Sequence, residues 1–285
     1  MVSVKVASFV GAVALIASAA QMVQRAHAAD LPQLPPVYAP PIEEYVASGW
    51  YLRGDIGITN QRLKKLDSNA AQQFPTADHG LGFDSSGLFG LGVGYQFNHW
   101  FRVDVTGQYR SRANFHGSQT LSLGPGDFNA DNFSGSKSEA LFLVNAYVDL
   151  GTWWSITPFV GFGVGASYNM ISGFRDDGTR CCAGGLTNSV TYFEDNGKWN
   201  FAWAAHAGLA YKVNPNLTLE LAYSYVSLGD ARPGAFRAFD GSISGQSSIV
   251  MKDLTSHDLK LGVRWMFDTP VEKGPVMLPP LRSRG

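Results

Sequence analysis

The chain has 285 residues, of which 13% are aromatic, 32 are glycine and 16% are charged, and its formal net charge is −1 at pH 7. Many glycines and aromatics with few charges are typical of an all-β membrane protein rather than a cytosolic enzyme. Without a basic stripe or a recognition motif, this charge gives no reason to expect a nucleic-acid partner.

The first 29 residues have the pattern of a secretory signal peptide. Lys5 supplies a positive charge, residues 6–20 are apolar and mostly small, and Ala26-His27-Ala28 fits the small-x-small cleavage rule. A proline-rich linker over 30–48 follows. No later apolar run approaches the roughly 18 residues of a transmembrane helix, so any membrane span is expected to consist of strands.

Eight segments alternate apolar and polar residues with a period of two, which predicts β-strands. The expected strands are 49–59, 88–97, 101–110, 139–150, 157–168, 199–213, 217–228 and 258–267. The third shows the pattern without a slip, because Val103 and Val105 alternate with Arg102 and Asp104. Each segment is about 10 to 15 residues long, enough for a tilted strand to cross a bilayer.

The connections between these strands alternate strictly in length. Short turns at 98–100, 151–156 and 214–216 alternate with long polar loops at 60–87, 112–138, 169–198 and 229–257. Outer-membrane barrels have this asymmetry, with short periplasmic turns and long extracellular loops. The predicted fold is therefore all-β, an eight-stranded antiparallel up-and-down transmembrane β-barrel over 49–267 in the cell outer membrane, followed by a proline-rich periplasmic tail over 268–285.

The volume of the side chains indicates which strand face points inward. An eight-stranded barrel has an interior just wide enough for side chains to fill. The apolar face carries too many rings to fit there: Trp50, Phe89, Tyr95, Phe97, Phe101, Tyr109, Phe142, Phe162, Trp199, Phe201, Trp203, Tyr223, Tyr225, Trp265 and Phe267. The other face suits a narrow lumen, with Gly90, Gly92, Gly94, Gly161, Gly163, Gly165, Ala202, Ala204, Gly208 and Gly262.

The inward face also carries twelve charged residues, six of each sign. The cations are Arg53, Arg102, Arg110, Lys212, Lys260 and Arg264, and the carboxylates are Asp55, Asp104, Glu139, Asp149, Glu220 and Asp258. Charges in a narrow lumen are tolerable only when they are paired and hydrogen-bonded. The balance favours a lumen filled by ion pairs, and the alternative is a thin polar conduit for small solutes.

Several motifs admit a functional and a structural interpretation. The two Gly-x-Gly-x-Gly runs at 90–94 and 161–165 lie inside strands, whereas a dinucleotide site needs a strand-to-helix turn. His206, Ser224 and Glu220 all face inward and could form a catalytic group, but a satisfied lumen histidine is the favoured interpretation.

The remaining mature histidines and the two cysteines suggest no cofactor. His79, His99, His116 and His257 are scattered and lack zinc spacing. Adjacent cysteines cannot staple distant parts of a fold, so Cys181 and Cys182 are interpreted as incidental loop thiols or a passive disulfide. The alternatives are a strained vicinal disulfide or a cross-link to another chain.

The last predicted strand resembles the C-terminal signal by which outer-membrane barrels engage their assembly machinery. Its apolar residues alternate and end in an aromatic: Leu261, Val263, Trp265 and Phe267. In that family the aromatic is usually the last residue, whereas here the tail over 268–285 follows. The tail is too short to be a folded peptidoglycan-binding domain.

Residues 49–57 (GWYLRGDIG) and 263–267 (VRWMF), with the signal peptide and the proline-rich lead, resemble the alphaproteobacterial opacity-type outer-membrane proteins. These are OmpA-like eight-stranded surface antigens, often labelled porins. The resemblance implies a structural and surface-interaction role, in envelope integrity and in contact with a host or the environment through the four long extracellular loops. We expect no catalysis and no cofactor. The implied partners are outer-membrane lipid and lipopolysaccharide, the barrel-assembly machinery, and host or surface ligands. The alternatives are a small-solute channel and, less favoured, an envelope enzyme or haem-binding surface protein.

Overall fold

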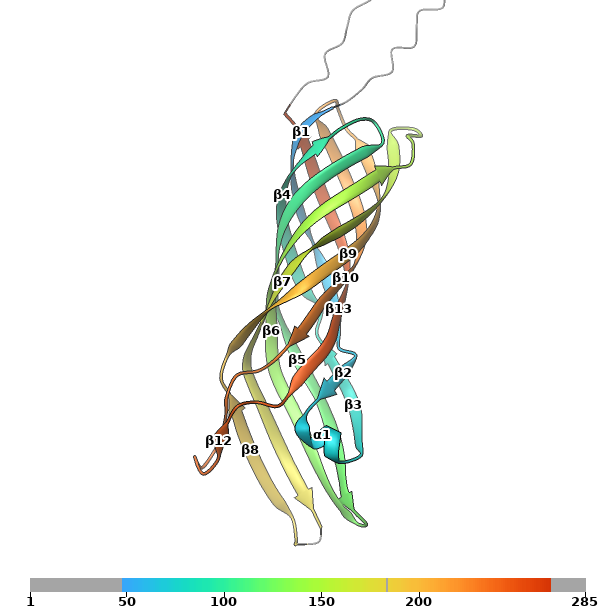
Figure 1. The fold of residues 1–285 in the computed structure, drawn as a ribbon. Coiled ribbons are helices and arrows are strands. Elements are labelled where there is room, and N and C mark those ends of the chain that lie inside the picture. Colours follow the sequence, from blue (N-terminus) through green and yellow to red (C-terminus); the bar gives the residue numbers. More distant parts are fainter. Residues whose placement is uncertain (1–47, 183, 268–285) are drawn as a thin grey trace, which may run out of the picture. The chain divides into compact units, whose positions relative to one another are not determined.

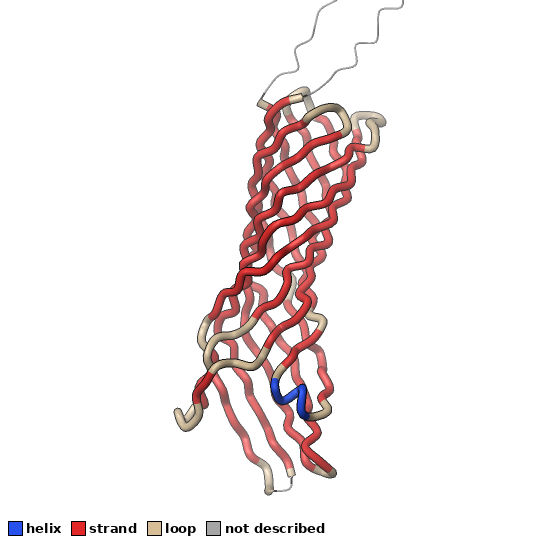
Figure 2. Tube along the Cα trace, viewed as in Figure 1, coloured by secondary structure: helices blue, strands red, loops and turns tan. Residues whose placement is uncertain are grey.

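The computed structural model describes residues 48–182 and 184–267, which form a closed β-barrel (Figures 1 and 2). The eight strands of the ring are β1 (Gly49–Arg62), β4 (Ser86–Gln96), β5 (Phe101–Gly124), β6 (Asp127–Asp149), β7 (Ile156–Cys181), β9 (Asn196–Lys212), β10 (Leu217–Ala231) and β13 (Val250–Met266). Every neighbouring pair is antiparallel, and the β1–β13 and β7–β9 pairings close the sheet. The predicted eight-stranded antiparallel barrel is confirmed.

Three predictions fall on segments outside the described residues. The signal peptide at 1–29, nearly all of the linker at 30–48 and the tail at 268–285 remain predictions. The described part of the chain contains one short helix, α1 (Asn69–Gln73), and no helix in it is long and apolar enough to span a membrane.

The short turns lie together at one end of the barrel, here termed the periplasmic end. Asn98 Oδ1 accepts hydrogen bonds from the backbone of Trp100 and Phe101, at 3.0 and 2.8 Å. The turn after β9 repeats this device, because Asn214 Oδ1 accepts from two backbone N–H groups at 2.9 and 2.8 Å. Asparagine side chains that imitate the backbone in this way are a common reason for tight turns.

The predicted long loops are wrong in one respect, since much of their length is strand. β5 and β6 continue as one hairpin to the tip at Gly124 and Asp127, and β7 runs on to Cys181. The shorter strands are β2 (Lys65–Asp67), β3 (Thr76–Phe83), β8 (Thr187–Phe193), β11 (Phe236–Ala238) and β12 (Ser244–Gly245). β2 pairs with β13, β3 with β5 and β8 with β7, while β11 pairs with β8 and β12 with β11. The parts of β5, β6 and β7 beyond the apolar band, with the strands paired to them, are here termed the extension. The many Ser, Asn and Gly residues resemble loop composition, but cross-strand pairing satisfies their backbone groups.

The two cysteines lie at the end of β7 and are bonded to each other. This arrangement is one of the alternatives that the sequence left open, and among the described residues it leaves no free thiol.

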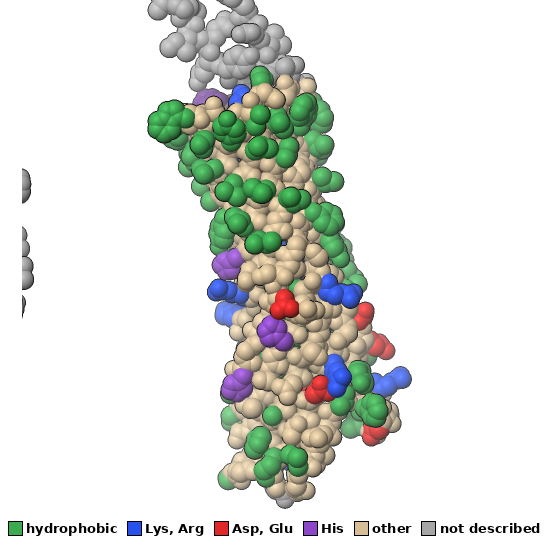
Figure 3. Space-filling view, turned by 180° about the vertical axis from the view of Figure 1, so that it is seen from behind, with side chains coloured by type: hydrophobic (Ala, Val, Ile, Leu, Met, Phe, Trp, Pro, Cys, Tyr) green, Lys and Arg blue, Asp and Glu red, His purple; other side chains and the backbone are tan. Residues whose placement is uncertain are grey.

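The apolar face of the ring points outward, as predicted. Ile56, Leu91, Phe162 and Leu261 are exposed by 65, 67, 53 and 60%. Figure 3 shows hydrophobic side chains covering the upper part of this surface, with charged side chains beginning beyond them. This apolar band is the surface that contacts lipid.

Glycine on the inward face leaves room for the charged side chains of the lumen. A Cβ atom at Gly92 would lie 2.7 Å from Thr106 Cγ2 and 3.1 Å from Arg53 Cγ. The wall between β1 and β5 therefore has no space for a larger residue at this position.

Candidate functional site: the filled lumen and the extracellular mouth

A first charge cluster is built around Arg53 on β1. Its guanidinium lies 2.9 Å from an Asp55 carboxylate oxygen, 2.9 Å from Asp104 and 3.5 Å from Glu220. It also donates a hydrogen bond of 3.0 Å to the hydroxyl of Tyr147. Strands β1, β5, β6 and β10 thus meet through one buried side chain, which fixes the lumen cross-section at this level.

Arg102 and Arg264 join the same cluster through Glu220. The Glu220 carboxylate lies 3.4 Å from the Arg102 guanidinium and 3.1 Å from that of Arg264. The Arg102 guanidinium carbon also lies 4.2 Å from the ring centre of Tyr147 and 4.7 Å from that of Phe159. Packing of a desolvated cation against two aromatic rings adds to the attraction of the carboxylates.

A second cluster lies further toward the extracellular end. Arg110 contacts Glu139 and Asp258, both at 2.6 Å. Lys137 also pairs with Glu139 and donates a hydrogen bond of 2.8 Å to Gln61 Oε1. The sequence prediction missed Lys137 because it falls in the presumed loop 112–138, although it lies two residues from Glu139 and so shares its strand face.

The structure places eleven of the twelve predicted lumen residues inside the barrel. Each of them is at most 7% exposed: Arg53, Asp55, Arg102, Asp104, Arg110, Glu139, Asp149, Glu220, Asp258, Lys260 and Arg264. Asp149 lies 3.4 Å from Arg102, and Lys260 interacts electrostatically with Asp55 and Asp258.

The prediction for Lys212 is wrong. It is the last residue of β9, where the wall ends, and its side chain is exposed. With Lys137 in its place, the buried lumen charges of the described residues again number six cations and six carboxylates, and a further buried carboxylate, Asp67, lies outside this set on β2.

An apolar plug fills the lumen toward the extracellular end, and the sequence prediction did not foresee it. On β10, Val226 and Leu228 follow Glu220 in this direction. Phe174 stacks on Phe115 and Phe133 with ring centres 5.9 and 5.8 Å apart. The plug comprises Leu66, Phe83, Ala113, Phe115, Phe133, Leu141, Leu143, Ile171, Phe174, Ala202, Ala204, Val226, Leu228, Ala231, Ile249, Met251 and Leu254. The lumen thus combines two charge clusters with a hydrophobic core.

His206 makes two hydrogen bonds inside the barrel. Its Nδ1 lies 2.7 Å from Ser224 Oγ, and its Nε2 lies 3.1 Å from Asn145 Oδ1. Glu220, the expected acid, is instead held by three arginines. Ser224 is fully buried, and its hydroxyl is closed off from solvent. This geometry supports a satisfied lumen histidine.

Two of the histidines that lie outside the lumen each contact a different hydroxyl group. His79 lies 3.2 Å from Thr120 Oγ1, and His257 lies 2.6 Å from the Tyr223 hydroxyl. Within the described ranges, no group of three or more His, Cys, Asp or Glu residues is arranged to hold a metal ion.

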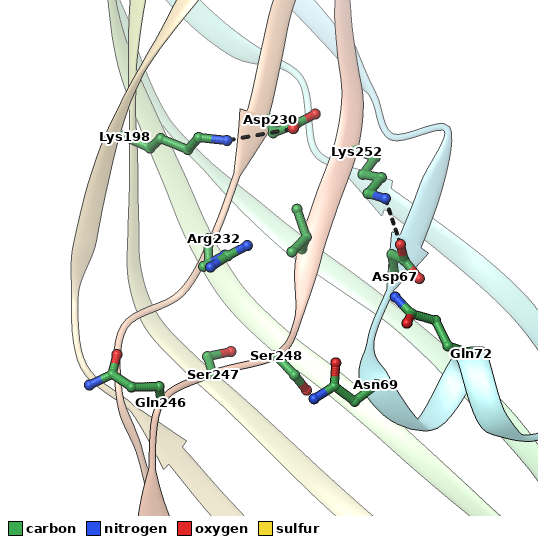
Figure 4. A pocket seen from close by; sticks show the side chains of 11 residues that line it. Asp67, Asn69, Gln72, Lys198, Asp230, Arg232, Gln246, Ser247, Ser248 and Lys252 are labelled. Carbon is green, nitrogen blue, oxygen red and sulfur yellow. Dashed lines mark ion pairs between the residues drawn. The ribbon is translucent and has the colours of Figure 1, made fainter.

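A polar cavity of about 490 Å³, here termed the mouth pocket, lies at the extracellular end of the barrel (Figure 4). Asp67 from β2 pairs with Lys252 from β13 at 2.6 Å, and Lys198 pairs with Asp230 at 3.5 Å. The pocket is lined by Asp67, Asn69, Gln72, Lys198, Asp230, Arg232, Gln246, Ser247, Ser248, Val250 and Lys252. It faces the outside of the cell above the filled lumen.

A second cavity, the rim cleft, lies on the outer wall where the apolar band ends. It has a volume of about 530 Å³ and is lined by Arg62, Leu63, Lys64, Tyr225, Ser227, Asp253 and Thr255. On β1, exposed Ile58 is followed on the same face by Asn60 and Arg62, so polar groups replace apolar ones within a few residues. Cations at this level face the headgroup zone of the outer leaflet.

The extension carries a carboxyl group whose titration should affect its stability. Burial, with contributions from Asp131 and Asp177, raises the pKa of Asp176 to about 7. A carboxyl group in the unfolded chain titrates near pH ~4. The folded state therefore binds this proton more tightly, and the resulting stabilisation is complete below about pH 4 and lost as the pH rises through about 7.

We expect Asp176→Asn to stabilise the extension by roughly 1–2 kcal/mol at pH 8 and to have almost no effect at pH 4. Hydrogen exchange of the β6 and β7 amides beyond the membrane measures this local stability. The same variant effect at both pH values would contradict the assignment.

Comparison with known proteins agrees with this architecture. The family described as outer membrane protein beta-barrel domain matches residues 11–267. A Brucella melitensis protein described as uncharacterized is 30% identical over 273 residues, covering 86% of this chain and 94% of the relative. A Rickettsia bellii protein named as a candidate adhesin is 28% identical over 229 residues, covering 76% and 87%.

Among solved structures, the outer membrane protein OprG from Pseudomonas aeruginosa is 17% identical, with a TM-score of 0.42, and covers 78% of this chain and 98% of that one. The family match spans the whole described barrel, with its outward apolar band and inward charges. The chain therefore belongs to the outer membrane protein beta-barrel domain family and is located in the outer membrane of a Gram-negative cell.

Proposed function

We propose that this protein is a structural and surface-interaction barrel that contacts its environment through its extracellular end and does not conduct solutes. The observation that carries this proposal is the filled lumen. In the lumen, six buried cations balance six buried carboxylates, and the apolar plug packs between the charge clusters and beyond them toward the extracellular end. A wide aqueous channel would instead have a polar, water-filled interior.

The extracellular extension supports a role in contact with other surfaces or molecules. Its strands carry polar side chains, and the mouth pocket, lined from β2, α1, β9, β10, β13 and neighbouring loops, opens at the same end of the barrel. The relative named as a candidate adhesin in Rickettsia bellii has a name consistent with such a role. We include in this proposal the finer resemblance to opacity-type surface antigens and the implied contact with host or environmental ligands.

Two further partners belong to the proposal. The rim cleft brings Arg62 and Lys64 to the headgroup level, where lipopolysaccharide carries its anionic groups. The outward strip on β13, with Leu261, Val263 and Trp265, has the alternation expected of a signal for the barrel-assembly machinery. Phe267 follows it at the end of the described wall and is 57% exposed.

A planar-bilayer recording of the purified chain tests the closed lumen. We expect insertion without sustained, discrete openings, because buried ion pairs and apolar side chains occupy the passage. A general porin recorded under the same conditions controls for the bilayer. Steady openings of reproducible size from this chain would overturn the proposal and favour the small-solute channel.

A further inference from the structure

The mouth pocket has an unbalanced charge. Three cations line it, Lys198, Arg232 and Lys252, against the two carboxylates Asp67 and Asp230. Both lysines are paired with these carboxylates, at 3.5 and 2.6 Å. Arg232 is exposed, and its guanidinium forms no ion pair with any residue of the described ranges. The pocket therefore offers one unopposed positive charge.

The rest of the lining is suited to hydrogen bonding. Amide and hydroxyl groups come from Asn69, Gln72, Gln246, Ser247 and Ser248, and Figure 4 shows their side chains around the opening. The wall includes a single apolar residue, Val250. Such a surface matches a ligand with many hydroxyl groups and gives little stabilisation to an apolar one.

Asp67 adds a carboxylate that the protein uses only in part, through Lys252 and an interaction with the Gln72 side chain. Its side chain is 9% exposed and its Oδ2 contacts Lys252 at 2.6 Å. Its Oδ1 is buried without a hydrogen bond, and the nearest cation there, Lys65 Nζ, is 3.9 Å away. A buried acceptor without a partner is costly, so a ligand hydroxyl that donates to Oδ1 would be stabilising.

We propose that the mouth pocket binds an acidic sugar, a polyhydroxylated ligand with one carboxylate. The ligand carboxylate would pair with Arg232, whose planar guanidinium can donate two parallel hydrogen bonds. Its hydroxyls would donate to Asp67 and exchange hydrogen bonds with the amide and serine side chains. The volume of about 490 Å³ falls within the usual range for small-molecule sites.

This proposal deepens the surface-interaction function and rests on it, because the pocket opens to the outside above a filled lumen. A simple anion would use Arg232 but not the hydroxyl and amide lining. A neutral sugar would offer no carboxylate to pair with Arg232. The pocket is therefore expected to prefer a ligand that combines one carboxylate with several hydroxyls over a simple anion or a neutral sugar.

Calorimetry on the purified full chain in detergent tests it with three probes: D-glucuronate, neutral D-glucose, and cyclohexanecarboxylate, which has one carboxylate on a six-membered ring without hydroxyls. We expect glucuronate to bind about tenfold or more tightly than either of the others, the effect of one charge-assisted contact. Arg232→Gln should remove this preference, and Asp67→Asn should weaken the binding of both glucuronate and glucose. Arg237→Gln, an exposed arginine on β11 outside the pocket, is the matched control and should change nothing.

Equal affinity for glucuronate and glucose, equally tight binding of cyclohexanecarboxylate, or a preference that survives Arg232→Gln would each overturn the proposal. Arg232 is exposed and unpaired within the described ranges, so loss of folding does not obscure this variant. If glucuronate does not bind as expected, the proposal of a closed surface-interaction barrel is unaffected. Steady conductance in the planar bilayer would overturn that proposal, whatever the result with the sugars.

Discussion

Replacing Arg110 with methionine is expected to lower the free energy of unfolding by about 3–5 kcal/mol, the usual loss when one partner of a buried ion pair is removed. Methionine keeps much of the volume but leaves Asp258 without its contact of 2.6 Å. Glu139 would retain only Lys137. Urea unfolding in lipid vesicles, followed by the difference in gel mobility between folded and unfolded barrel, measures the change.

Arg112 provides the matched control on the same strand. It is exposed, so Arg112→Met should alter stability by no more than about 0.5 kcal/mol. If both variants unfolded at the same urea concentration as the parent chain, the charge cluster would not stabilise the barrel.

Leu91→Arg should destabilise the barrel by about 2–4 kcal/mol, because it places a charge in the middle of the lipid-facing band. Leu91 is 67% exposed and lies opposite Gly54, at the centre of the outward faces of β4 and β1. The same vesicle unfolding assay applies. Unlike Arg110→Met, this variant leaves the lumen unchanged.

Asn60→Arg serves as the control for depth, since Asn60 is exposed on β1 beyond Ile58. Its cost should fall to about 0–1 kcal/mol near the interface. Equal costs at the two positions would mean that the outward band does not contact the hydrocarbon core.

The sequence predicted the ring well because each wall strand separates two different solvents. In Phe101–Arg110, lipid and lumen demand opposite residues at alternate positions, so the period of two is strong. The extension shows that contrast only weakly, because its outer face meets water rather than lipid and Ser, Asn and Gly residues lie among the few buried ones such as Phe115 and Phe133. Residues 112–138 therefore resembled a loop, and Lys137, which lies among them, was not predicted as a lumen residue.

The candidate site was predictable only in part for a related reason. Alternation gives the direction of a side chain but not its depth, so Lys212 at a strand end resembled a lumen residue. The apolar plug was hidden because Leu141 and Leu228 lie among polar inward residues in the sequence. Their clustering depends on how eight tilted strands bring distant positions together.

The long β5–β6 hairpin has a mechanical consequence. From Tyr109, at the edge of the apolar band, β5 continues to Gly124, which at about 3.4 Å per residue is roughly 50 Å of strand. Cross-strand pairing to β6 continues almost to its tip. A disordered segment of equal length would lose entropy whenever a partner fixed its end. A stiff hairpin has already lost that freedom, so an approaching cell surface would meet the tip of this protein before it met the lipid.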